Sequence, residues 1–533
     1  MDSGGQSGGM RMGRAVWLSA ATMSSRLLGL VRDQLFAALV GANRFSDAFV
    51  VAFRIPNLLR DLFAEGALSS AFVPTFAEAH ARRGPEDAYR LANALVGLVL
   101  SVVGAVVLLG VLAAPALVGL LAPGFGPEEA ALAAFLTRVM MPFLLLVSLS
   151  ALAMGMLNAQ GKFTAPALAP ALFNVGAIAV GVWLWAAGKG PRVAVVGWSM
   201  GTLVGGLMQL AAQVPSLWAL GYRPHPRLGA SALRDPGIRR IGRLMGAAVI
   251  GLSATQVNIL VNTIFASHEV GANTWLQMAF RLMQLPLGVF GVAIATVAGA
   301  GVAQRAARRD LDGVRETLGS AMRLVAFFNV PAAVGLVVLA GPIISLVYEH
   351  GRFGPTDAAA TAGALVCYAV GLYGYSSVKV LAPAFYALDE ARVPVVGSIV
   401  GMASNVALNL ALYPVLGFRG VALGTSLAAT ANFAVLAVAW KRRHGGLGQA
   451  GIYRQLLRCL GAATVMAVVV WGSARLLEAR LPTAGLGRQA TLALAPIAAG
   501  ALAYFAAARA LGVKELGDVA AALRRRRERR GGP

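Results

Sequence analysis

Apolar runs of about 18 residues or more recur along almost the whole chain, separated by short segments that contain Gly, Pro and charged residues. As an α-helix, each run is long enough to cross a hydrocarbon core about 30 Å thick. The strict apolar–polar alternation of a membrane-spanning β-barrel is absent. The pattern therefore predicts an all-α polytopic membrane protein with roughly fourteen spans. The predicted spans are 14–40, 46–76, 89–121, 130–158, 165–188, 193–220, 240–267, 272–303, 316–348, 358–388, 394–414, 418–440, 455–477 and 488–512.

Composition supports this class. Of the 533 residues, 58% are hydrophobic and only 13% are charged, which lies outside the range of soluble globular domains. Residues 1–9 are polar and Gly-rich, and the first apolar span contains charged residues. We therefore expect no removable signal peptide, so that the first helix stays in the protein.

Basic residues are unevenly distributed between the two sets of alternating loops. Most of them fall on one predicted face, which includes 223–243, 441–443 and the tail at 524–530. The positive-inside rule then predicts a multi-pass protein of the bacterial inner membrane with both termini in the cytoplasm. The net charge of +23 does not indicate nucleic acid, because it is spread over many loops without a recognition motif. Attraction to anionic lipid headgroups explains it better.

The residues that catalysis or a cofactor would need are missing from the pattern. Cys367 and Cys459 fall inside or at the ends of predicted spans, so they indicate neither a disulfide framework nor a zinc site. No two histidines have metal-ligand spacing, and no nucleotide-binding signature occurs. We therefore expect a protein that is not an enzyme and has no metal or organic cofactor.

A pattern of repeated short motifs relates the two halves of the chain. Three short motifs of the first half recur in the second half in the same order. Such matches also arise by chance in Ala-rich helices, but two parallel repeats around a central cavity are a plan of transporters. The motifs are GAN at 41–43 and 271–273, AFR at 52–54 and 279–281, and ARR at 81–83 and 307–309.

The repeat predicts two six-helix lobes around a central cavity, followed by two extra C-terminal helices. The expected organisation is an N-terminal tail at 1–12, an N-lobe at 13–222, a linker at 223–237, a C-lobe at 238–443, two helices at 444–513 and a basic tail at 514–533.

Charged residues inside predicted spans are the strongest candidates for function. Arg26, Arg32 and Asp33 lie in the first span. A charge at the centre of a membrane helix costs at least about 2.5–3.5 kcal/mol, so these side chains must face protein or a water-filled cavity. The second predicted span adds Asp47, Arg54, Arg60, Asp61 and Glu65, and the eighth adds Arg281.

Each of these charges has an ordinary structural explanation, as a buried Arg–acid pair or a side chain that reaches an interface. As a set they indicate more. After Arg32 is paired with Asp33, and Arg60 with Asp61 or Glu65, arginine remains in excess. Arginine is suited to bidentate contacts with phosphate. The set therefore predicts an anionic, phosphate-bearing substrate and disfavours a cation exporter.

The N-terminal motifs closely resemble the MurJ/MviN family of lipid II flippases. The resemblance covers about residues 12–510 and keeps the motifs in order. The motifs are SRLLGLVRD at 25–33, SDAF at 46–49, IPNLLR at 55–60, FAEGA at 63–67, AFVP at 71–74, FRLMQLPLGV at 280–289 and VKVLAPAFY at 378–386.

This resemblance implies the fold of the MOP exporter superfamily, and as cargo lipid II, an undecaprenyl-pyrophosphate-linked peptidoglycan precursor. Movement would be from the cytoplasmic to the periplasmic leaflet by alternating access. It further implies that Arg26, Arg32 and Arg281 hold the pyrophosphate, and that Asp33 orients Arg32. By the same match, the gate or lobe-contact residues are Asp47, Arg60 and Glu65.

The sequence departs from the family at a sodium site that some members resemble. That site includes acidic side chains, and the matching positions here carry none. Neutral oxygen ligands bind sodium more weakly, and Asn on membrane helices often only links neighbouring helices. We therefore do not expect sodium coupling, and the membrane potential is the alternative. The matching positions are Asn262, Asn405, Asn409, Val421 and Thr425.

Three alternatives from other classes remain open. A multidrug or polysaccharide-intermediate exporter of the same superfamily is the first. An enzyme acting on polyprenyl phosphates would need paired acidic motifs that we do not find. A structural scaffold would leave the intramembrane arginines unexplained. The expected partners are lipid II, membrane lipids and cell-wall synthesis proteins, with no nucleic acid and a monomeric chain.

Overall fold

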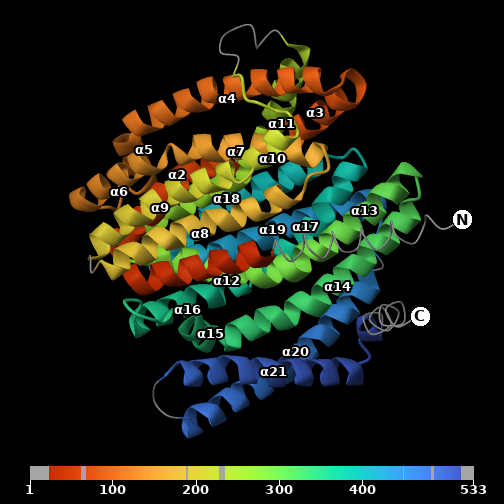
Figure 1. The fold of residues 1–533 in the computed structure, drawn as a ribbon. Helices are drawn as coiled ribbons and strands as arrows, with labels where there is room; N and C mark the ends of the chain where they lie inside the picture. Colours follow the sequence, from red (N-terminus) through yellow and green to blue (C-terminus); the bar gives the residue numbers. More distant parts are fainter. Residues whose placement is uncertain are drawn as a thin grey trace, which may run out of the picture. The chain divides into compact units, whose positions relative to one another are not determined.

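The computed structural model describes residues 23–61, 68–187, 190–226, 235–447, 449–481 and 485–517. These ranges are helical and contain no β-strand, which confirms the predicted all-α class (Figure 1). A first helix is described over residues 23–40. The helices of the N-terminal half that follow it are α2 (Arg44–Arg60), α3 (Ser69–Arg83), α4 (Pro85–Leu112), α5 (Ala114–Leu121), α6 (Pro127–Met140), α7 (Phe143–Ala159), α8 (Thr164–Ala186), α9 (Pro191–Ala211), α10 (Val214–Ala219) and α11 (Pro236–Ala266).

The C-terminal half contains one π-helical turn, η3 (Leu287–Val292), between two α-helices. The α-helices are α12 (Ala272–Pro286), α13 (Ala293–Ala307), α14 (Leu311–Val338), α15 (Ala340–Tyr348), α16 (Pro355–Ala369), α17 (Leu372–Ala387), α18 (Arg392–Leu416), α19 (Phe418–His444), α20 (Gln449–Arg480) and α21 (Leu486–Ala510).

Ten helical segments in the described ranges are long and apolar enough to span a membrane. An eleventh span is added if α16 and α17, which are bent by 43°, are counted as one. These eleven correspond to eleven of the predicted spans. The remaining three, at 14–40, 46–76 and 240–267, include residues or side chains outside the described part. The total of fourteen therefore stays a prediction.

The chain divides into two compact units, and the first comprises Met1–Thr274 together with Gly351–Phe353. One apolar cluster of this unit joins α3, α4 and α7 through side chains such as Phe72, Leu95 and Leu152. Helix α11 joins this cluster through Ile238 and Ile241. Helix α11 therefore packs with the helices that precede it in the chain. The predicted lobe boundaries rest on counting helices and stay a prediction.

An ion pair fixes the beginning of α11 to the end of α3. Arg240 donates a hydrogen bond from Nη1 to Oε2 of Glu78 at 2.7 Å, and Arg82 lies 3.1 Å from the other carboxylate oxygen. The hydrogen bond from Arg240 and the charges of both arginines lower the pKa of Glu78. Because both partners are exposed, the pair adds orientation rather than much stability.

Helices α8 and α9 approach each other through glycine. A Cβ on Gly176 would lie 2.8 Å from the Cα of Gly205, and a Cβ on Gly205 would overlap the backbone carbonyl of Phe173. Small residues at such positions let membrane helices pack closely, because apolar burial alone does not drive their association in lipid. The two helices lie side by side in Figure 1.

Segment Gly351–Phe353 comes from the middle of the second half of the chain but packs in the first unit. The N–H of Arg352 donates a hydrogen bond of 2.8 Å to the carbonyl of Ala38, one of the carbonyls left over at the end of helix 23–40. Gly41 has a φ of +78°, and a Cβ there would lie 2.8 Å from the carbonyl oxygen of Arg352. The contact therefore requires glycine at position 41.

The second unit comprises Trp275–His350 and Gly354–Pro533. Pro286 ends α12 and cannot donate a backbone hydrogen bond, and the chain continues as η3 before α13 begins. Gly291 of η3 packs against α17, where a Cβ would lie 2.6 Å from Oγ of Ser376. The interruption after Pro286 therefore takes the form of a π-helical turn.

Helices α20 and α21 pack on α14 through an apolar cluster that includes Phe327, Met466 and Tyr504 (Figure 1). Polar contacts reinforce this attachment. The hydroxyl of Tyr504 donates to the carbonyl of Phe327 at 2.7 Å. Glu515, only 4% exposed, accepts a hydrogen bond of 2.9 Å from Nε of Arg323 and another from Gln455. The two C-terminal helices are therefore firmly joined to the second unit.

Candidate functional site

The predicted arginines of the first helix lie in the first unit. Arg32 donates hydrogen bonds from Nε and Nη2 to Oδ1 of Asp33 at 3.2 and 2.8 Å, and its Cζ lies 5.6 Å from the ring centroid of Phe173. The side chains of Arg32 and Asp33 are 18% and 13% exposed. Nη1 of Arg32 makes no hydrogen bond within the described residues. The guanidinium is thus held on one edge, while its other edge offers donors to an anion.

Arg26 lies almost two helical turns before Arg32 and is exposed. Its backbone neighbour Ser25 accepts a hydrogen bond of 3.2 Å from Nδ2 of Asn174 in α8, which fixes this part of the helix. Arg281 lies in α12 of the second unit, where it is half-buried next to Phe280. The neighbouring Phe280 ring packs edge-on against Tyr368, with centroids 5.2 Å apart. The shared role predicted for these arginines stays a prediction.

Asp47 is buried, 1% exposed, in the first turn of α2. Its carboxylate accepts hydrogen bonds from the N–H of Gly271 at 2.5 Å, the N–H of Thr274 at 2.9 Å and the hydroxyl of Thr274 at 2.7 Å. Gly271 and Thr274 lie at the beginning of α12, where the first backbone N–H groups have no partner within the helix. A carboxylate is favoured at a helix N-terminus by the helix dipole. Asp47 therefore caps α12 from a position 224 residues earlier in the chain.

The other predicted gate residues lie at the end of α2. Arg60 donates from Nη2 and Nε to Oδ1 of Asp61 at 3.0 and 3.3 Å. The two side chains are 23% and 34% exposed. Glu65 falls at 62–67, outside the described residues. The predicted pairing of Arg60 with Asp61 is therefore present, and the alternative partner Glu65 lies outside the described residues.

Arg54, which lies in the middle of α2, contacts α11. Its Nη1 donates to the hydroxyl of Thr263 and, at 3.3 Å, to the carbonyl of Ile259. The charge is therefore satisfied by polar groups of a neighbouring helix within the first unit. For Arg54, a structural role in joining α2 to α11 therefore explains the charge without a substrate.

The positions that match a sodium site are divided between the units. Asn262 lies in α11 of the first unit, and the others line the seam between α18 and α19. Nδ2 of Asn405 donates to Oγ1 of Thr425 at 3.3 Å, and Nδ2 of Asn409 donates to Oδ1 of Asn405 at 3.4 Å. Oγ1 of Thr425 donates to the carbonyl of Val421 at 2.7 Å. The contact between Asn405 and Thr425 links α18 to α19, the other two lie within one helix, and no carboxylate takes part in these three contacts.

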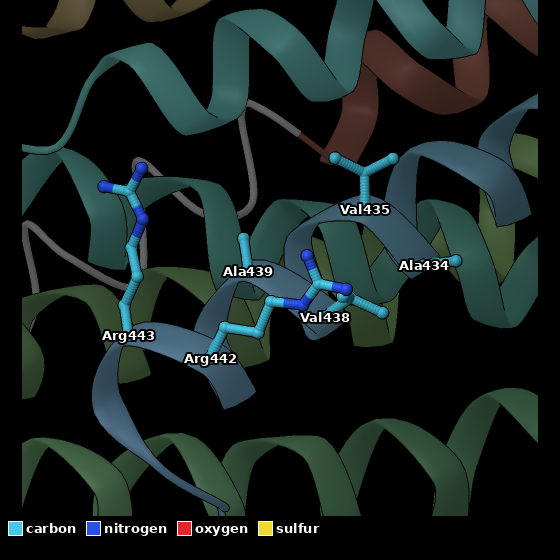
Figure 2. A pocket seen from close by; sticks show the side chains of 6 residues that line it. All are labelled: Ala434, Val435, Val438, Ala439, Arg442 and Arg443. Atoms are coloured by element: carbon cyan, nitrogen blue, oxygen red, sulfur yellow. The ribbon is translucent and has the colours of Figure 1, made fainter.

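Sequence reasoning missed one concave feature on α19. A groove of about 530 Å³ is lined by residues of this helix, with two arginines at its C-terminal end (Figure 2). Lys and Arg at 441–443 were recognised only as part of a basic face. The signal that was available is the spacing of small apolar residues that leads up to them. The lining residues are Ala434, Val435, Val438, Ala439, Arg442 and Arg443.

The chain is similar in sequence to known proteins over most of its length. A family model described as "Lipid II flippase MurJ" matches residues 36–483. The "Probable lipid II flippase MurJ" of Vibrio cholerae serotype O1 is 35% identical over 449 residues, which cover 82% of each chain. The protein of the same name from Rhizobium meliloti is 33% identical over 515 residues, which cover 95% of each chain.

Solved structures share the fold. One titled "Lipid II flippase MurJ, inward closed conformation" matches with a TM-score of 0.77 at 25% sequence identity, covering 92% of this chain and 98% of that chain. An inward-facing multidrug resistance MATE family transporter of the MOP superfamily matches with a TM-score of 0.67 at 16% identity, covering 82% and 99%. The second likeness concerns the fold alone.

Proposed function

Because the chain belongs to the lipid II flippase MurJ family, we propose that it moves lipid II from the cytoplasmic to the periplasmic leaflet of the bacterial inner membrane. The membrane-spanning character of the described helices agrees with this activity. The proposed orientation, with both termini in the cytoplasm, follows from the basic loops. Fusing a reporter that is active on only one side of the membrane to each terminus tests it.

The residue that best supports the proposal is Arg32, whose guanidinium is hydrogen-bonded to Asp33 through Nε and Nη2 but not through Nη1. Asp33 occupies one edge of the fork, which fixes its direction, and Nη1 stays available for an oxygen of the diphosphate. Arg26 is exposed on the same helix and adds a second positive charge. We assign Arg281 of the second unit to the same substrate group, as the family motif implies.

Asp47, Arg60 and Glu65 receive a conformational role in this proposal. The carboxylate of Asp47 holds the start of α12, the helix that carries Arg281. A change in this cap would therefore alter the position of a proposed substrate residue without any contact between Asp47 and the lipid. Arg60 and Glu65 are assigned to the gate or lobe contact by family motif.

We propose the membrane potential rather than a sodium gradient as the source of energy. The described seam between α18 and α19 offers neutral oxygen atoms, and the family's acidic positions are replaced. Moving one charge through 100 mV supplies about 2.3 kcal/mol. Flipping measured in vesicles with an imposed potential, in the presence and absence of sodium, separates the two sources.

The experiment that tests the function is complementation of a strain in which the native lipid II flippase can be depleted. The wild-type chain is compared with Arg26→Ala, Arg32→Ala and Arg281→Ala at matched membrane expression. Arg44→Ala serves as the control, because Arg44 begins α2, is 56% exposed and lies 3.9 Å from Glu128 at the nearest approach. We expect wild type and control to restore growth and the three variants to fail.

Two results would contradict the proposal at different levels. If the wild-type chain is well expressed but neither restores growth nor exposes lipid II on the periplasmic side, the substrate assignment is wrong. If it restores growth and all three arginine variants do so equally, the chain is a flippase but these arginines are structural.

A further inference from the structure

The groove on α19 is an amphipathic feature that the proposed function does not use. Its lining residues occur at i, i+1, i+4, i+5, i+8 and i+9, so they form one stripe along the helix. The short side chains of Ala434 and Ala439 leave space at the helix surface, and Val438 is 50% exposed. From Ala434 to Arg442 the stripe extends about 12 Å at 1.5 Å per residue.

The opposite face of α19 is locked into the second unit. Leu436 and Trp440 are 0% and 1% exposed and belong to the apolar cluster of α13, α14 and α17. The ring of Trp440 packs edge-on against Phe385, with centroids 5.4 Å apart. Because this face is buried, the stripe that contains Val438 and Arg442 must point away from the core of its own unit.

Positive charge is concentrated at one end of the groove. Arg443 lies 3.3 Å from Glu390, which also lies 3.3 Å from Nε2 of His444, so part of the charge of Arg443 is balanced. Arg442 makes no hydrogen bond or ion pair within the described residues. In Figure 2 its side chain extends toward Val438, whereas that of Arg443 points away from it. The groove thus combines an apolar floor with an unbalanced cation.

We propose that this groove binds one anionic phospholipid, with the phosphate at Arg442 and part of an acyl chain along Ala434, Val435, Val438 and Ala439. Charge complementarity favours this occupant, because arginine forms bidentate contacts with phosphate. A soluble anion would leave the apolar floor uncovered, whereas a lipid covers both ends of the stripe. Basic residues at the end of a membrane helix are the usual place for such headgroups.

The test is native mass spectrometry of the purified full-length chain, incubated with phosphatidylglycerol or with phosphatidylcholine of the same acyl length. We expect selective retention of phosphatidylglycerol by wild type. Arg442→Gln is expected to weaken this binding about tenfold through loss of a charge-assisted contact. Lys441→Gln is the matched control, since Lys441 carries the same charge in the same turn but does not line the groove. This control is expected to bind like wild type.

A second variant tests the apolar part without changing the charge. Val438→Trp fills the groove with a side chain that tolerates a lipid environment, so folding is preserved while the acyl chain is excluded. We expect it to reduce binding of phosphatidylglycerol as strongly as Arg442→Gln does.

Each of four results would overturn the proposal: equal retention of the two lipids, equal effects of Lys441→Gln and Arg442→Gln, no effect of Val438→Trp, or displacement of phosphatidylglycerol by an equimolar polyprenyl diphosphate. The second would show diffuse charge attraction, and the last would assign the groove to the transported lipid. None of these readouts depends on flipping, so failure here is distinguishable from failure of the proposed function.

Discussion

Replacing Asp47 with Asn tests whether one buried carboxylate holds the start of α12. Asp47 accepts three hydrogen bonds there, two from backbone N–H groups and one from a hydroxyl. The hydroxyl of Thr274 has a second acceptor, Oγ of Ser46 at 2.9 Å, so its loss is partly compensated. The two backbone groups have no such alternative among the described contacts, and the Asn side chain offers only one acceptor oxygen to them.

The expected cost follows from these contacts. Hydrogen bonds to a charged group contribute about 1.5–3 kcal/mol each, and a buried donor left without a partner costs about 1–3 kcal/mol. We therefore expect Asp47→Asn to weaken the local structure by about 3 kcal/mol. Since 1.36 kcal/mol corresponds to a factor of ten, amide exchange at Gly271 and Thr274 is expected to become about 100-fold faster.

Hydrogen–deuterium exchange followed by mass spectrometry, on peptides that cover the start of α12, measures this effect. Asp87→Asn is the control, because Asp87 also lies in the first turn of a helix but is 42% exposed and, among the described residues, pairs only with Arg90 at 3.5 Å. Its expected effect is within about 0.5 kcal/mol. Unchanged exchange at Gly271 and Thr274 in Asp47→Asn would refute the capping role.

Three further changes test the packing of each unit. Gly205→Ala is expected to destabilise the α8–α9 pair by about 1–3 kcal/mol, because the new Cβ would overlap the carbonyl of Phe173. The control Gly104→Ala, which has open space around it, is expected to be neutral or stabilising. Chemical unfolding compares the free energies of unfolding of the two variants. Glu515→Gln is expected to loosen the chain after α21 by about 1–3 kcal/mol, detected as faster proteolysis at 511–517. Lowering the pH below about 4.5 is expected to speed exchange in the first turn of α11, because the pKa of Glu78 is lowered in the folded protein.

The sign of the pH effect follows from the direction of that pKa shift. A carboxylate with a lowered pKa stabilises the fold at pH values above its unfolded pKa, and this contribution is lost as the pH falls through the folded pKa. Glu78→Gln removes the titrating group, so exchange at α11 in this variant should not change over the same range. An equal pH response in wild type and variant would show that another group is responsible.

Local features of the fold were predictable from the sequence because the signals are local. Apolar runs bounded by Gly and Pro predicted eleven spans that the described helices reproduce. The resemblance to the MurJ/MviN family, read from motifs such as 25–33, agrees with the family match over residues 36–483.

Long-range contacts were not predictable in the same way. Asp47 was recognised as a charge inside a span, but its partners lie more than 200 residues away, and no local pattern identifies them. The GAN repeat illustrates the limit. Asn43 caps α2, accepting hydrogen bonds from Phe45 and Ser46, whereas Asn273 is buried inside α12 with no hydrogen bond to its side chain in the described residues. The same tripeptide therefore has different roles, because Asp47 provides the cap in the second case.

The docking of Gly351–Phe353 has a consequence for biogenesis. Ala38 and Gly41 are synthesised about 310 residues before the segment whose backbone packs against them, an interval of roughly 15–60 s at usual rates of translation. Helices 23–40 and α2–α11 can enter the membrane as they emerge, but their compact unit lacks one piece until the ribosome has passed position 353. During that interval the end of helix 23–40 carries an unpaired carbonyl, so nascent chains of this protein depend on the insertion machinery or on water to satisfy it.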